Sequence, residues 1–161
     1  MSIPTKLAAI ICAAVLSCGL LAGCAGQGNT ATQEQKDNRA YMSQVNELMV
    51  ELDEGLDSFV AAVSRNDIVN MRLQAENAYQ SIDKLAKLEA PEALADVQKQ
   101  YVDGTEKLRE ALDAYIALYS DMNSGSFDQS TYDKRVADVQ KLYDEGVAAL
   151  EEADKTASGK E

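Results

Sequence analysis

Apolar side chains recur at alternating steps of three and four residues through most of the chain, and this spacing limits the fold more than any other feature. On an α-helix such a spacing gathers the apolar side chains on one face, which a globular protein then buries. The pattern occupies four stretches between residues 37 and 156, and no strand-like alternation of apolar and polar residues accompanies it. The sequence therefore predicts an all-α domain built from four amphipathic helices.

The apolar pattern changes phase at residues 64–67, Pro91 interrupts it, and Asn123-Ser124-Gly125-Ser126 ends the third stretch. Short connections favour antiparallel neighbours, so we expect an antiparallel up-down-up-down four-helix bundle. The predicted inward positions are Tyr41, Val45, Leu48, Leu52, Gly55, Phe59 and Ala62 in the first helix; Ile68, Met71, Ala75, Ala78, Ile82 and Leu85 in the second; Leu94, Val97, Tyr101, Gly104, Leu108, Ala111, Tyr115, Leu118 and Met122 in the third; and Tyr132, Val136, Val139, Tyr143, Gly146, Leu150 and Ala153 in the fourth.

Residues that end or begin helices indicate the connections. The pattern slips at residues 64–67, where Asn66 or Asp67 is a good N-cap, so we predict a turn there. One long, bent helix over residues 38–89 is the alternative, because no glycine or proline forces a break at the slip. Pro91 disfavours helix at the residue before it and suits the first turn of a new helix.

The beginning of the chain predicts export. One basic residue, Lys6, precedes an uncharged and almost wholly apolar segment at residues 7–22. This segment is shorter than the ~20 residues that a helix needs to cross a bilayer. A basic start followed by a short apolar segment and small residues is typical of a secretory signal that is removed from the mature protein.

The end of that segment carries a more particular motif. Leu21-Ala22-Gly23-Cys24 resembles the lipobox of bacterial lipoproteins, in which an aliphatic residue and two small residues precede a cysteine. The resemblance implies that the Cys24 sulfur receives diacylglycerol, that the signal is cleaved between Gly23 and Cys24, and that the protein is lipid-anchored on the extracytoplasmic face of the cell membrane. The alternatives are an uncleaved signal anchor, or ordinary cleavage nearby that leaves Cys24 a free thiol.

A second resemblance lies in the helical part. The segments Leu88-Glu89-Ala90-Pro91-Glu92 and Tyr101-Val102-Asp103-Gly104 resemble small all-helical lipoproteins of Gram-positive bacteria, whose function is generally not established. The predicted divisions are a signal peptide at residues 1–23, the lipidated cysteine and a flexible linker at 24–36, a four-helix domain at 37–156 and a frayed tail at 157–161. The polar linker would reach roughly 20 Å. Thr32 and Gln35 have capping-box spacing, so the alternative is that part of the linker begins the first helix.

The charge of the chain restricts its partners. The sequence has 27 acidic and 15 basic side chains and a formal charge of −12. Loss of Lys6 with the signal would leave 15 − 1 = 14 basic residues and a charge of 14 − 27 = −13. Nucleic acid is not expected as a partner, because phosphate binding needs a basic face. Anionic lipid headgroups would repel this domain, so the acyl chains on Cys24 have to hold it at the bilayer.

The residue types that remain exclude several kinds of chemistry. The chain has no histidine, which removes Ser-His-Asp catalysis and imidazole zinc sites. Cys12 and Cys18 lie in the predicted signal peptide and Cys24 is predicted to be lipidated, so no thiol is left for catalysis or metal binding. The stretch that begins at Asp121 briefly resembles a calcium loop, but its glycine comes one position too early. We therefore expect no enzymatic activity, no cofactor and no metal site.

Acidic residues gather twice along the predicted helices. One cluster consists of Asp53, Glu54 and Asp57, and the other consists of Asp144, Glu145, Glu151, Glu152 and Asp154. The second cluster lies near a helix C-terminus, where the helix dipole disfavours negative charge. We interpret both clusters as solvated, repulsive surfaces. The alternative is a docking face for a basic partner or a weak cation site.

Three glycines fall on inward positions in the middle of helices, where glycine costs about 1 kcal/mol relative to alanine. Their estimated heights along a bundle put them in one central layer, which three tyrosines also reach. Either the tyrosine rings fill the space that the glycines leave, or a narrow pocket with hydroxyl groups at its ends lies there. The candidate pocket residues are Gly55, Tyr79, Tyr101, Gly104, Tyr143 and Gly146.

Two functional hypotheses follow from these features. The first is a membrane-tethered, non-enzymatic interaction module whose partner is an envelope protein or a wall component. The alternative is a small-ligand-binding or sensory helical bundle, which would use the pocket at the glycine and tyrosine layer.

Overall fold

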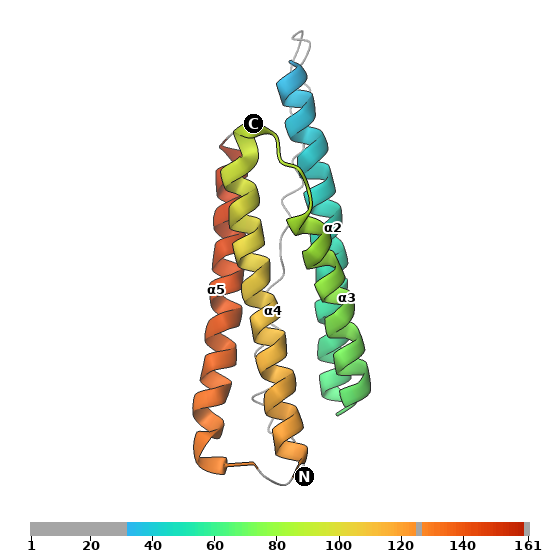
Figure 1. The fold of residues 1–161 in the computed structure, drawn as a ribbon, viewed down its shortest axis with the longest axis vertical. Coiled ribbons are helices and arrows are strands. Elements are labelled where there is room, and N and C mark those ends of the chain that lie inside the picture. The colour runs from blue at the N-terminus through green and yellow to red at the C-terminus, as the bar shows by residue number, and fades with distance from the viewer. Residues whose placement is uncertain (1–31, 125–126, 160–161) are drawn as a thin grey trace.

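The computed structural model describes residues 32–124 and 127–159, and this part of the chain is helical without any strand. Figure 1 shows four long helices along the long axis of the molecule. They are α2 (Gln33–Ser64), α3 (Ile68–Ala86), α4 (Ala95–Asn123) and α5 (Tyr132–Ser158), with short 3₁₀ helices η1 (Glu92–Leu94) and η2 (Gln129–Thr131) before the last two. The predicted all-α class is confirmed.

The first helix begins earlier than predicted. Thr32 is the N-cap of α2, and its hydroxyl oxygen accepts a hydrogen bond of 3.2 Å from the Gln35 backbone N–H. The Gln35 side chain accepts one of 3.0 Å from the Thr32 backbone N–H, which completes a capping box. Residues 33–36 therefore belong to α2 and not to the linker predicted over residues 24–36.

The connection between α2 and α3 is the predicted turn. Asn66 has a φ of 56°, a left-handed conformation that asparagine adopts more readily than most residues. The Asp67 carboxylate then accepts a hydrogen bond of 3.1 Å from the Asn70 backbone N–H and caps α3. One long helix over residues 38–89 is excluded, because both the conformation of Asn66 and the cap at Asp67 interrupt it.

Proline and aspartate mark the other two connections. Pro91 lies between the end of α3 and the start of η1, outside any helix interior, as predicted. Asp128 accepts a hydrogen bond of 2.9 Å from the Ser130 backbone N–H at the start of η2, and α5 follows directly. At its other end α5 continues to Ser158 with Ala157 buried, so the frayed tail predicted over residues 157–161 begins too early.

The predicted inward positions form the core, with a few at its edge. Ile68, Met122 and Val136 are only partly buried, and the other predicted positions are buried. Phe59 of α2 meets Tyr115 of α4 edge to face, with ring centroids 5.5 Å apart. A second buried row on α2, at seven-residue steps, widens its apolar face beyond the predicted stripe: Met42, Met49, Leu56 and Val63.

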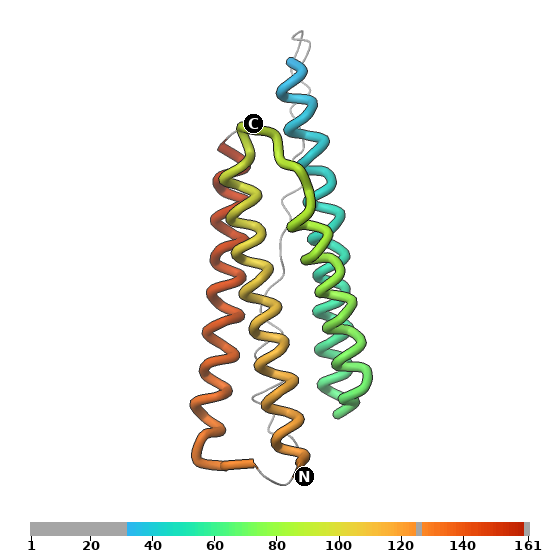
Figure 2. The backbone as a smooth tube through the Cα atoms, in the orientation of Figure 1, coloured from blue at the N-terminus to red at the C-terminus, as the bar shows by residue number. Residues whose placement is uncertain are grey.

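The helices pack in two close pairs. The closest backbone packing joins α4 to α5 and α2 to α3, and α3 also packs against α4 (Figure 2). None of the described helices is both long enough and apolar enough to cross a membrane. The predicted signal peptide at residues 1–23, its cleavage site between Gly23 and Cys24, and the predicted lipidation site at Cys24 lie outside the described residues.

We predict that Asp67→Ala lowers the midpoint of thermal unfolding by roughly 2–8 °C, because the first turn of α3 loses its side-chain cap. Circular dichroism measures this change. Asp67→Asn is the matched control, since asparagine retains an oxygen that accepts the Asn70 N–H. An equal loss in both variants would contradict capping as the cause.

Candidate functional site

Two of the three inward glycines lie against each other where α4 meets α5. A Cβ atom on Gly146 would lie 2.9 Å from the Gly104 carbonyl oxygen and 2.9 Å from Leu108 Cδ2. A Cβ atom on Gly104 would lie 3.0 Å from Leu150 Cδ2 and 3.1 Å from the Gly146 carbonyl oxygen. The two backbones are therefore in direct contact, and leucine side chains occupy the space beside them.

The third glycine has a different neighbour. A Cβ atom on Gly55 would lie 3.4 Å from Ala78 on α3, which is an ordinary van der Waals distance. Gly55 and Ala78 thus bring α2 close to α3, as Gly104 and Gly146 bring α4 close to α5. Each helix pair has its own contact between small residues.

The three candidate tyrosines are directed to different places. The Tyr101 ring is buried and its hydroxyl donates a hydrogen bond to the Asp154 carboxylate of α5. Tyr143 is buried on α5. Tyr79 is half-buried on α3, and its hydroxyl donates a hydrogen bond of 2.5 Å to Asp113 of α4. The first two rings belong to the core, and the third lies at the surface between α3 and α4.

A polar cluster covers that surface. Arg109 of α4 forms an ion pair of 2.5 Å with Asp83 of α3, and its guanidinium carbon lies 4.9 Å from the centre of the Tyr79 ring. Burial raises the pKa of the Tyr79 hydroxyl well above its ordinary value, and the hydrogen bond to Asp113 and the charge of Asp113 add to this rise. We call Tyr79, Asp83, Arg109 and Asp113 the α3–α4 polar cluster. It joins the two helix pairs, and its two carboxylates already accept hydrogen bonds from the Tyr79 hydroxyl and the Arg109 guanidinium.

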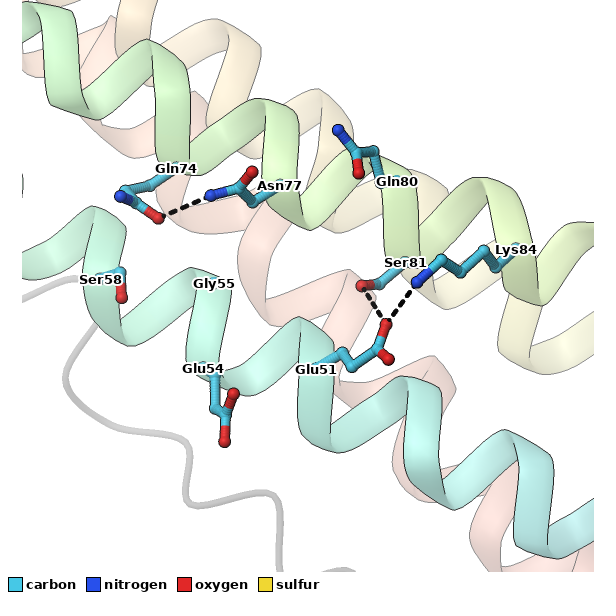
Figure 3. Close-up of a pocket in the computed structure, with 9 residues that line it drawn as sticks. All are labelled: Glu51, Glu54, Gly55, Ser58, Gln74, Asn77, Gln80, Ser81 and Lys84. Atoms are coloured by element: carbon cyan, nitrogen blue, oxygen red, sulfur yellow. Dashed lines mark hydrogen bonds and ion pairs between the residues drawn. The ribbon is translucent and has the colours of Figure 1, made fainter.

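An open groove lies on the outer face of the α2–α3 pair (Figure 3). Its volume is about 310 Å³. Most of its lining is polar, and it consists of Glu51, Glu54, Gly55 and Ser58 from α2 and Gln74, Asn77, Gln80, Ser81 and Lys84 from α3. Of the six candidate pocket residues, only Gly55 lines it. We call it the α2–α3 groove.

One end of the α2–α3 groove is closed by an ion pair. Glu51 accepts a hydrogen bond of 2.8 Å from the Lys84 ammonium group and one of 3.3 Å from the Ser81 hydroxyl (Figure 3). The hydrogen bond from Lys84 and the charge of Lys84 lower the pKa of Glu51. This carboxylate is already paired.

Beyond Glu51, the acidic cluster on α2 lacks such compensation. Partial burial raises the pKa of Asp53, and the negative charges of Asp57 and Glu54 raise it further. Glu54 is exposed and forms no ion pair with any residue that the structure describes. Of this cluster only Glu54 lines the α2–α3 groove, and no ion pair in the described part of the chain offsets its negative charge.

The acidic cluster on α5 is more dispersed. The Glu145 carboxylate lies 3.6 Å from the Lys141 ammonium group, and the Glu152 carboxylate lies 3.9 Å from that of Lys155. The Asp154 carboxylate accepts a hydrogen bond from the Tyr101 hydroxyl. Within residues 32–124 and 127–159, no group of three or more metal-ligating side chains is placed to hold a metal ion. At the calcium-like stretch, Asp121 is paired with Arg135 at 2.8 Å, and Gly125 lies outside the described residues.

Several buried polar atoms have no protein partner among the described residues. They include the hydroxyl groups of Tyr41, Tyr115 and Tyr132 and the side-chain carbonyl oxygen of Asn38. Burial raises the pKa of Tyr115, and the nearby Tyr119 and Tyr132 hydroxyl groups raise it further. The sequence predicted that these tyrosines are buried but gave no signal for the absence of a partner.

Comparison with known proteins adds no assignment. No protein-family model, no curated protein and no solved structure matches this chain. The chain's own residues and their geometry are therefore the basis of the functional proposal.

The glycines give a paired prediction. Gly146→Ala should destabilise the protein by about 1–3 kcal/mol, because the new methyl group meets a backbone carbonyl that cannot move away. Gly55→Ala should stabilise it by up to ~1 kcal/mol, because its methyl group fits against Ala78 and alanine favours the helix. Chemical denaturation of both variants measures the difference. Equal effects at the two positions would contradict the described packing.

Alkaline unfolding gives a second prediction. Burial raises the pKa of Tyr41 from 10.0 to about 12. Below the ordinary tyrosine pKa of ~10 both the folded and unfolded states keep this proton. Between that value and the folded pKa only the folded state keeps it, so the free energy of unfolding falls as the pH rises. Urea titrations across this interval should show a steeper fall for the parent protein than for Tyr41→Phe. Equal slopes in the two proteins would contradict the prediction.

Proposed function

We propose that this protein is a membrane-anchored, non-enzymatic interaction module on the extracytoplasmic face of a bacterial cell membrane, and that it binds an envelope protein or a wall component. The anchor is the diacylglycerol that the lipobox resemblance assigns to Cys24. A single acyl chain binds a bilayer only marginally, so two or more chains on Cys24 are needed for stable attachment.

We further propose that the four helices form an antiparallel up-down-up-down bundle. Contacts within the α2–α3 and α4–α5 pairs support this arrangement. In each pair, moving forward along the first helix brings its residues against earlier residues of the second helix, as antiparallel packing requires. Gly55 meets Ala78 while Glu51 meets Lys84, and Gly104 meets Gly146 while Tyr101 meets Asp154. The alternating direction of the colour gradient in Figure 1 agrees with these contacts.

The packing at Gly104 and Gly146 is the observation that favours an interaction module over a ligand-binding bundle. The alternative function requires space between the helices at the glycine and tyrosine layer. There the two backbones touch, and Leu108 and Leu150 fill the space beside them. A ligand between α4 and α5 at this level would have to displace a close contact between two helices.

The outer surface offers more for recognition than the interior does. The α2–α3 groove presents carboxylate, amide and hydroxyl groups to solvent along two helices. The proposed tether supports the same function, because a lipid anchor at Cys24 would keep the helical domain at the membrane surface. The sequence supports a non-enzymatic role, because it lacks histidine and its only cysteine outside the predicted signal peptide is the proposed lipid attachment site.

The anchor is tested by Cys24→Ser. Serine cannot form the thioether to diacylglycerol, so the protein should leave the detergent phase in a phase-partitioning experiment, and its precursor should accumulate or be released by another peptidase. Mass spectrometry of the parent protein should show the lipid on Cys24. Unchanged size and unchanged partitioning of Cys24→Ser would refute the anchor.

The partner is tested by photo-crosslinking in intact cells with the full, lipidated chain. A photoreactive amino acid is placed at exposed positions on different faces, Gln80 on α3 and Ala137 on α5. We expect at least one position to crosslink to an envelope protein or a wall fragment. Failure of every position under several growth conditions would contradict the interaction module.

A further inference from the structure

The α2–α3 groove exists because the residues at the centre of this helix–helix contact are small and leave space that longer side chains would fill. Gly55 has no side chain, and a Cβ atom there would already lie 3.4 Å from Ala78. The longer side chains beside this contact come from both helices, and Figure 3 shows Glu54 and Gln80 directed away from each other. The result is a solvent-open groove lined from both helices, and a chain that lies along it can contact both of them.

The α3 side of this groove carries side-chain amide groups with unused hydrogen-bond donors and acceptors. The Asn77 amide nitrogen donates a hydrogen bond of 3.0 Å to the Gln74 carbonyl oxygen. This bond leaves the Gln74 amide nitrogen as a donor and the Asn77 carbonyl oxygen as an acceptor, and neither has another partner among the described residues. A peptide group has one acceptor and one donor, so it complements this pair of amides.

The α2 side supplies unbalanced negative charge. Glu51 is neutralised by Lys84, whereas Glu54 on the next turn forms no ion pair in the described part of the chain. Asp53 and Asp57 do not line the groove, but they lie near Glu54 on α2 and add to the negative field of this helix. A lysine or arginine side chain on a bound segment would meet an attractive field along this helix.

We propose that the α2–α3 groove binds an extended, lysine- or arginine-bearing segment of a protein partner. The Gln74 and Asn77 amides bind its peptide groups, and Glu54 pairs with its basic side chain. This inference rests on the proposed function as an interaction module and names the partner by its chemistry. The overall negative charge of the chain favours approach of the same kind of partner.

The test uses the full, lipidated protein in detergent micelles and a fluorescent ten-residue peptide of alternating glycine and lysine. Fluorescence anisotropy measures its Kd. Glu54→Gln should raise the Kd about three-fold, as for loss of one exposed ion pair. Asn77→Ala should raise it by a similar factor through a lost hydrogen bond. A glycine–glutamate peptide of the same length should not bind.

Glu151→Gln is the matched control, because it removes the same charge from an exposed glutamate on α5 that forms no ion pair with a described residue. Its effect should stay well below that of Glu54→Gln. Equal weakening by both variants would overturn the groove, because net charge alone would then explain the binding. Tight binding of the glutamate peptide, or no effect of Asn77→Ala, would also overturn it.

The crosslinking experiment separates this inference from the proposed function. A crosslink from Gln80 to a lysine- or arginine-bearing peptide of a partner supports both. Crosslinks from Ala137 alone, or from Gln80 to a glycan, support the interaction module and overturn the peptide groove. Absence of crosslinks at both positions contradicts the interaction module itself.

Discussion

The direct backbone contact between α4 and α5 is the constraint on which the interior of this protein depends. Gly104 and Gly146 permit it because each lacks the Cβ atom that would collide with the carbonyl oxygen of the other. The short distance between α4 and α5 also lets Leu108 and Leu150 pack across the interface and lets the Tyr101 hydroxyl reach Asp154. Glycine is unfavourable inside a helix, so this packing has to offset a cost at both positions.

The same principle recurs in the other helix pair with a different result. Gly55 meets Ala78, which keeps α2 and α3 close but leaves an ordinary contact. The side chains beside this contact are polar and belong to the outer face, so closeness of the helices produces a groove there and not a core layer. The Phe59–Tyr115 ring contact and the α3–α4 polar cluster then join the two pairs.

Local signals in the sequence were sufficient to predict the four helices and most of the positions where they begin and end. The slip of the apolar pattern at residues 64–67 corresponds to a left-handed Asn66 followed by a cap at Asp67, and Pro91 lies outside the helices. These features depend on the preferences of single residues, which act within one turn. The row of buried residues that includes Met42 and Met49 was missed, because a seven-residue row beside the main stripe is recognised only when a neighbour covers it.

The sequence by itself determined the helical class, the inward positions of the three glycines and of Tyr101 and Tyr143, and the excess of acidic residues. Each of these follows from the spacing and type of residues along one chain. Only the tertiary structure decided that Gly104 faces Gly146 while Gly55 faces Ala78, because the register between two helices depends on packing over their whole length. It also decided that the polar residues of α2 and α3 form one groove. On separate helices Glu54 and Asn77 are ordinary solvated side chains, and they become a shared surface only where the two helices meet.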